Sequence, residues 1–125
     1  MTSRRLDALF AERVLNRSVQ RHLMLDEEGN GWLDLPHFTQ SLDAAWEGVE
    51  KIRAGENGAY RVELVWDAWE WDAWEDGRNG SWTVEIGVDP CCVWSQSARP
   101  ALAIVKACLF AAGVSQEEID EAAKE

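Results

Sequence analysis

Residues 60–66 read YRVELVW and residues 82–88 read WTVEIGV, and these two stretches decide the fold. In both, apolar side chains alternate largely with polar or small ones, which is the period-2 pattern of a β-strand. Between them, residues 77–80 read GRNG, which is typical of a turn. We therefore expect an antiparallel hairpin over residues 60–88, followed by a third short strand at the sheet edge over residues 91–94.

Helical spacing of apolar residues replaces this alternation on both sides of the hairpin. The second helix carries such a set at Leu42, Ala45, Trp46, Val49 and Ile52. Ser115 and Glu118 form a capping box at the start of the last helix. Residues 17–25 either continue the first helix or form a separate turn. The predicted helices are 4–16, 42–54, 100–112 and a short C-terminal helix over 116–123.

The chain has 125 residues, of which 46% are hydrophobic and 28% charged, as in an ordinary folded domain. A sheet of about three strands needs helices packed on it to bury its apolar residues. We therefore predict a single α+β domain over residues 1–125. In it, a small antiparallel β-sheet is packed with helices in an α/β/α-type layered sandwich.

The formal net charge of -11 makes the chain a poor general ligand for DNA or for an anionic membrane. No run reaches the roughly 18 apolar residues that a bilayer span requires. Charged residues interrupt the beginning of the chain, so no signal peptide is expected. Three cysteines without a CxxC spacing predict reduced thiols in a cytoplasmic protein. We expect no direct nucleic-acid or membrane partner.

Three segments resemble a known family in their order and spacing. They read LDALFAERV over residues 6–14, FTQSLDAAWEGVEKI over residues 38–52 and ARPALAIVKACL over residues 98–109. With the hairpin between them, they resemble the phage ABA sandwich domain, a family of phage- and prophage-encoded proteins of unassigned activity. The resemblance implies an α/β/α layered fold over residues 6–113 and transfers no catalytic residue. The hairpin is longer and richer in tryptophan and acids than in that family.

A tandem repeat lies inside the hairpin, where residues 66–70 read WDAWE and residues 71–75 read WDAWE again. A period of five matches neither a strand nor a helix, so the indoles cannot all share one buried face. The stretch 63–76 also holds six acids and no base. We predict that the partner-binding residues are Trp66, Asp67, Trp69, Glu70, Trp71, Asp72, Trp74, Glu75 and Asp76. Alternatively, the indoles fold back on the protein's own helices and the acids are simply solvated.

Exposed indoles supply apolar contact area, and the surrounding acids select a basic partner. Together with the phage resemblance, this pattern predicts a non-catalytic phage accessory protein that binds a host protein with a basic surface. Such a protein acts, for example, as an inhibitor of a bacterial defence system, in the manner of an anti-CRISPR protein. Electrostatic attraction would speed its encounter with a basic groove or nucleic-acid channel. The acidity serves only solubility in the simplest alternative.

Two other functions stay open. Residues 26–37 read DEEGNGWLDLPH and have the outline of an EF-hand calcium loop, with oxygen ligands at positions 1, 3, 5 and 9 and glycine at position 6. His37 stands at position 12, where a bidentate glutamate is needed, and the loop occurs once. A calcium-binding module is therefore one alternative, and a small-molecule-binding domain is another. The sequence holds no phosphate-binding loop or nucleophile triad, so we expect no enzyme activity, cofactor or resident metal.

Charge is distributed unevenly along the chain. Residues 1–24 hold five arginines against Asp7 and Glu12, which gives this segment a net charge of +3. Because the whole chain has a net charge of -11, the remaining residues have a net charge of -14. A basic helix of one copy can therefore meet the acidic hairpin of another and form a homodimer. Alternatively, the basic helix and the acidic segments of the same molecule contact each other, which would neutralise these charges without a dimer.

Overall fold

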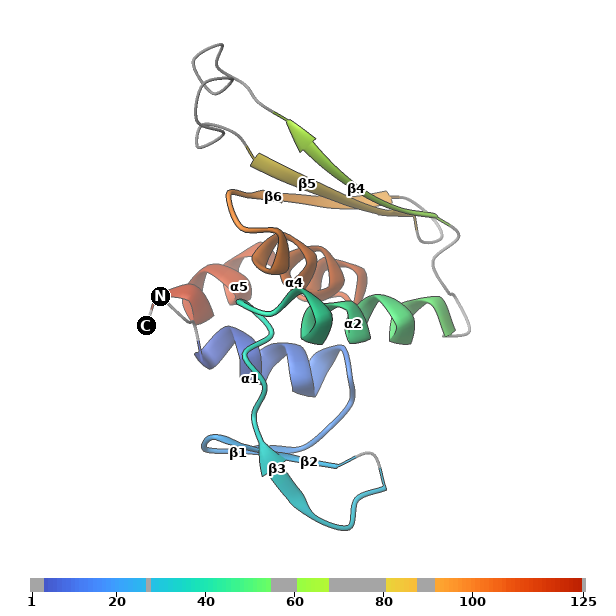
Figure 1. The fold of residues 1–125 in the computed structure, drawn as a ribbon. Coiled ribbons are helices and arrows are strands. Elements are labelled where there is room, and N and C mark those ends of the chain that lie inside the picture. The colour runs from blue at the N-terminus through green and yellow to red at the C-terminus, as the bar shows by residue number, and fades with distance from the viewer. Residues whose placement is uncertain (1–3, 27, 55–60, 68–80, 88–91, 125) are drawn as a thin grey trace.

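The computed structural model describes residues 4–26, 28–54, 61–67, 81–87 and 92–124 (Figure 1). These residues form an α+β fold with four helices and two small antiparallel sheets of three strands each, which confirms the predicted class. The helices are α1 (Arg4–Arg13), α2 (Leu42–Ala54), α4 (Pro100–Ala111) and α5 (Gln116–Ala123). The strands are β1 (Val19–Gln20), β2 (Leu23–Leu25), β3 (Trp32–Asp34), β4 (Arg61–Asp67), β5 (Ser81–Gly87) and β6 (Cys92–Ser97).

The first sheet has the strand order β1-β2-β3 and the second the order β4-β5-β6. The predicted hairpin is the pair β4 and β5, and β6 is the expected third strand, shifted to Cys92–Ser97. The first sheet was not predicted. Residues 17–25 neither continue the helix nor form a simple turn, because Arg21 adopts a left-handed φ of 57° between two short paired strands.

The layers follow the order sheet, helices, sheet, as Figure 1 shows. The sequence predicted helices on both faces of one sheet instead. Helix α4 accounts for the difference, because its buried residues cover most of its circumference: Ala101, Ala103, Ile104, Val105, Ala107, Cys108 and Leu109. A helix with so wide an apolar surface needs neighbours on several sides. Strands β5 and β6 cover one side of α4, and helices α1, α2 and α5 contact it elsewhere.

The Phe10 ring of α1 packs against α2 and against the segment that precedes α2. Phe10 of α1 is fully buried, and its ring lies 4.6 Å from the ring of Phe38, centroid to centroid. Gly48 of α2 faces the same ring, and a Cβ atom at this position would lie only 2.7 Å from Phe10 Cε2. Glycine is therefore required here by the close approach of the two helices and not by its backbone angles.

Helix ends agree with the sequence to within three residues. Helices α2 and α5 have the predicted bounds, and α4 ends one residue before the predicted 112. Helix α1 ends at Arg13 and not at residue 16, because Asn16 adopts a left-handed φ of 56° that reverses the chain. Ser115 caps α5 as predicted, since its hydroxyl oxygen accepts a hydrogen bond of 3.2 Å from the Glu118 backbone N–H.

A buried carboxylate joins the start of α1 to the segment before α2. Asp7 is fully buried, and its Oδ atoms accept hydrogen bonds of 2.9 Å from Arg4 and from the Thr39 backbone N–H. Arg4 also donates to the Leu35 carbonyl at 2.6 Å and to His37 Nδ1 at 3.1 Å. A buried charge is tolerated when it is paired and hydrogen-bonded in this way.

No helix within the described ranges is long and apolar enough to cross a membrane.

Candidate functional site

The structure describes only part of the predicted partner-binding surface. Seven of its residues lie outside the described ranges: Trp69, Glu70, Trp71, Asp72, Trp74, Glu75 and Asp76. Trp66 and Asp67 belong to β4, where their backbones pair with Trp82 and Ser81 of β5, but their side chains are not described. The exposure of the WDAWE repeat therefore stays a prediction.

The strand register of the β4-β5-β6 sheet separates an inner face from an outer face. Residues directly opposite each other in antiparallel strands share a face. Leu64, Val84 and Ser95 form one such row, in which Val84 and Ser95 are buried. The Ser95 hydroxyl donates a hydrogen bond of 2.6 Å to the Ala103 carbonyl of α4. This row therefore lies on the inner face, against α4.

The neighbouring row lies on the opposite face of the sheet. It consists of Glu63 in β4, Glu85 in β5 and Trp94 in β6, in cross-strand register. The Trp94 side chain is 61% exposed, more than any other large hydrophobic residue in the described ranges. We call this surface the outer sheet face, and its described members are Glu63, Val65, Thr83, Glu85, Cys92, Trp94 and Gln96.

The outer sheet face combines apolar area with negative charge. Val65 is 44% exposed beside Glu63, and Cys92 is exposed beside Trp94. Glu63 and Glu85 stand directly opposite each other, at the roughly 5 Å separation of cross-strand Cβ atoms. Two carboxylates at this separation raise the local negative potential and attract a cationic group. This face has the chemical character that the sequence predicted for residues 66–76, but on different residues of the same sheet.

Sequence reasoning missed Trp94 because the alternation in β6 defines two faces without saying which one is buried. Val93 and Ser95 share one face, and Trp94 lies between them on the other. Hydrophobicity alone would place the tryptophan inside, because tryptophan is well buried on average. The hydrogen bond from Ser95 to α4 reveals the true orientation, and it depends on tertiary structure.

The EF-hand interpretation of residues 26–37 is corrected by the structure. An EF-hand loop joins two helices, whereas this segment follows strand β2 and contains strand β3, which pairs with β2. The Asp26 carboxylate accepts a hydrogen bond of 2.8 Å from the Asn30 backbone N–H, and Gly29 turns the chain with a φ of 74°. In the described part of the chain, which omits Glu27, no three His, Cys, Asp or Glu side chains are grouped to hold a metal ion.

The basic start of the chain makes a contact within the molecule. Arg13 of α1 donates from Nη2 to both carboxylate oxygens of Glu118 in α5, at 3.2 and 3.1 Å. Both side chains are about half exposed, so this ion pair adds little stability. It does neutralise one of the five N-terminal arginines with an acid of α5. The predicted self-association through the hairpin stays a prediction.

Two of the three cysteines, Cys92 and Cys108, lie in the described ranges. Cys92 is exposed on the outer sheet face, whereas Cys108 is buried in α4. Burial raises the pKa of the Cys108 thiol from 9.0 to about 12, because the charged thiolate is poorly solvated there. Cys108 is therefore an inert packing residue.

A solved structure shares the fold described above. It is the crystal structure of a phage protein from Bacillus cereus ATCC 14579, which aligns with a TM-score of 0.70 and 18% sequence identity. The alignment covers 92% of this chain and 91% of the other. At this identity, the similarity establishes the fold alone. No family model and no curated protein sequence matches the chain, so the resemblance to the phage ABA sandwich family stays a prediction.

Proposed function

We propose that this protein is a non-catalytic phage accessory protein that binds a host protein through the outer sheet face. The observation that carries the proposal is the exposure of Trp94, at 61%, in a cross-strand row with Glu63 and Glu85. The predicted repeat at 66–75 begins with Trp66 and Asp67 of β4 and continues into the connection between β4 and β5 of the same sheet. It would extend this surface along the hairpin.

The exposed indole favours a protein as the partner. The inner face of the sheet is already packed against α4, so Trp94 contributes little to the core. Tryptophan is enriched among the residues that dominate the binding energy of protein interfaces, where it supplies a large and rigid contact area. The adjacent carboxylates and the net charge of -11 select a basic partner and speed the encounter with it.

Phage origin is supported by two separate similarities. The fold is shared with a phage protein from Bacillus cereus ATCC 14579, and the sequence resembles the phage ABA sandwich family. A basic surface on a bacterial protein is commonly one that contacts nucleic-acid phosphates. Inhibition of a bacterial defence protein, as by an anti-CRISPR protein, is therefore the specific form of host binding that we propose. The protein would act in the host cytoplasm.

Affinity capture from host-cell lysate tests this proposal. We expect the immobilised protein to capture a basic host protein at low and at physiological salt, and Trp94→Thr to abolish the capture. Trp32→Thr is the matched control, because Trp32 is 45% exposed on β3 of the other sheet. Capture that both variants retain, or no basic protein captured even at low salt, would contradict the proposal.

A further inference from the structure

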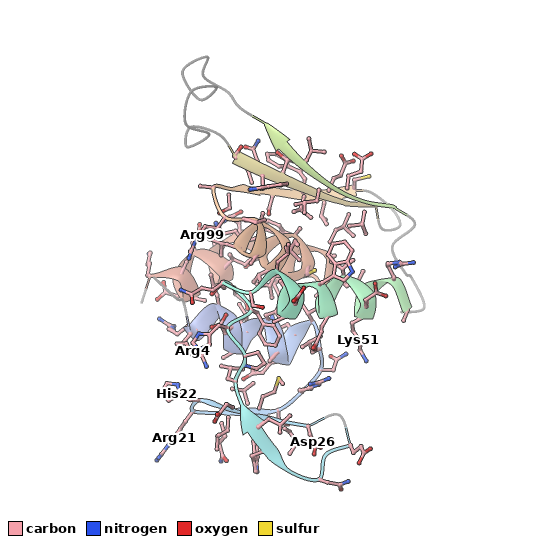
Figure 2. All side chains as sticks on the ribbon, in the orientation of Figure 1. Arg4, Arg21, His22, Asp26, Lys51 and Arg99 are labelled. Carbon is pink, nitrogen blue, oxygen red and sulfur yellow. The ribbon has the colours of Figure 1, made fainter. Side chains whose placement is uncertain are left out.

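A second acidic surface lies beside α2, away from the outer sheet face. A groove of about 900 Å³ separates α2 from residues 15–18 and from the loop that follows β2. Figure 2 labels Lys51 on the α2 side and Asp26 on the loop side. We call this surface the α2 groove. Its carboxylates are Asp26, Glu28, Asp43, Glu47 and Glu50.

An exposed aromatic side chain forms part of the wall of the α2 groove. Trp46 is 37% exposed, and its Nε1–H donates a hydrogen bond of 3.1 Å to Glu50 Oε1, which restrains the indole ring. Leu42, one turn earlier on the same helix, is 44% exposed. The sequence placed both residues on the apolar face of this helix, but the residues that α2 buries are Ala45, Gly48 and Val49.

The charges that line the groove are unbalanced. Five carboxylates and two cationic side chains, Arg17 and Lys51, line the groove. One of the carboxylates, Glu50, is also paired with Arg53 outside the lining, at 3.2 Å, so the carboxylates still outnumber the cations. The face of an indole also attracts a cation, and arginine is the side chain that most often makes this contact. A ligand that suits both features carries several positive charges and at least one flat or compact cationic group.

The shape of the groove favours an extended ligand. Trp46, Asp43, Glu47 and Glu50 are all exposed residues, so the groove is open along α2. Sites for small molecules enclose most of the ligand surface and are mainly apolar. An open acidic groove along a helix instead suits a segment of a protein chain.

We infer that the α2 groove binds an arginine- or lysine-rich segment of a partner protein. One cationic side chain of the segment lies against the Trp46 indole, and others pair with the carboxylates of α2 and of the loop after β2. This inference does not depend on the function proposed for the outer sheet face. The two surfaces lie on different elements, so a substitution in one leaves the other intact.

A labelled octapeptide of alternating arginine and serine provides the test, with binding followed by fluorescence anisotropy at physiological salt. We expect Trp46→Ala to weaken binding by about 2- to 5-fold, the loss of one exposed cation–π contact. The double variant Asp43→Asn with Glu47→Gln should weaken it more than Glu117→Gln with Asp120→Asn. This control removes the same charge from exposed residues of α5. Equal losses in the two double variants would show attraction to net charge alone and overturn the inference.

A gain of affinity provides a test that unfolding cannot imitate. Lys51→Gln removes a cation from the groove lining and should tighten peptide binding, whereas Lys124→Gln at the end of α5 should tighten it less. Unchanged binding in both variants would contradict the inference. Spermidine is also a polycation, with one positive charge fewer than the four arginines of the octapeptide provide, and it has no peptide chain. If spermidine bound more tightly than the octapeptide and lost affinity in Trp46→Ala, the ligand would be a small polycation and the inference of a protein segment would fail.

Discussion

The contact between α1 and α2 and the outer sheet face both depend on an aromatic side chain, but in opposite ways. Phe10 is fully buried against Phe38 and Gly48, whereas Trp94 is 61% exposed in a row of carboxylates. At the contact between α1 and α2, few side chains other than phenylalanine would fit the space beside Phe38 and Gly48. On the outer sheet face, packing does not require a tryptophan at position 94. Folding therefore explains Phe10, whereas the proposed binding of a host protein would explain the exposure of Trp94.

The largest effect is expected at the buried aromatic contact. Phe10→Ala should lower the free energy of unfolding by about 3–5 kcal/mol, because it leaves a cavity between α1 and α2 that the surrounding helices fill only in part. Urea unfolding followed by circular dichroism measures the change. A loss below about 1 kcal/mol would mean that this contact is not the tightly packed region that the structure describes.

The cysteines provide the same comparison through chemical reactivity. Near pH 8, the thiolate population of Cys108 should be about a thousandfold below that of a thiol with the ordinary pKa, because burial raises its pKa from 9.0 to about 12. Iodoacetamide should therefore modify the exposed Cys92 and spare Cys108 until the protein unfolds. Peptide mapping by mass spectrometry distinguishes the sites. Equally rapid modification of Cys108 under native conditions would contradict its burial.

The same shift of the Cys108 pKa predicts how stability depends on pH. Above pH 9 the thiol ionises in the unfolded chain, whereas in the folded protein it stays neutral up to about pH 12. Its contribution to stability is therefore complete below pH 9 and is lost as the pH rises towards 12. Urea midpoints measured at increasing alkaline pH should fall more steeply for the native sequence than for Cys108→Val. Parallel curves would contradict the prediction.

Substitution of Gly48 tests how closely the backbone of α2 approaches the Phe10 ring of α1. Gly48→Ala should cost about 1–3 kcal/mol, because the added Cβ overlaps the Phe10 ring. In the Phe10→Ala background the overlap with the ring is gone, and the remaining tight contact is with Val14 Cγ1 at 3.2 Å. Once the Val14 side chain shifts by a few tenths of an ångström, the same substitution should stabilise the helix by up to about 1 kcal/mol. A double-mutant cycle of urea unfolding measures this change of sign. Additive effects of the two substitutions would show that Gly48 and Phe10 do not meet.

Much of the fold could be predicted because several elements carry strong local signals. Residues 42–54 have a sustained helical period, and residues 116–123 directly follow a capping serine, Ser115. Residues 61–67 and 81–87 alternate over seven positions each, long enough to show a period of two. In these elements, local pattern and tertiary packing require the same residues.

The rest depended on tertiary contacts that the sequence does not express locally. Strands β1 to β3 have only two or three residues each, too few to show an alternation. The order of the layers follows from the burial of α4 over most of its circumference, which periodicity along one helix does not specify. Trp46 has the spacing of the buried Ala45 and Val49, yet it lies at the margin of their stripe and is exposed. The candidate surfaces were missed for the same reason.

The smallest effect on stability is expected at the outer sheet face. Trp94→Thr should change the free energy of unfolding by no more than about 0.5 kcal/mol, because the ring is 61% exposed and threonine favours strands. Trp82→Thr is the matched control, since Trp82 lies in the same sheet but packs half-buried against the core. It should cost about 2–3 kcal/mol, less than the 3–5 kcal/mol typical of a fully buried aromatic residue. If thermal and urea unfolding gave equal losses for the two variants, Trp94 would be a packing residue and would no longer support the proposed binding surface.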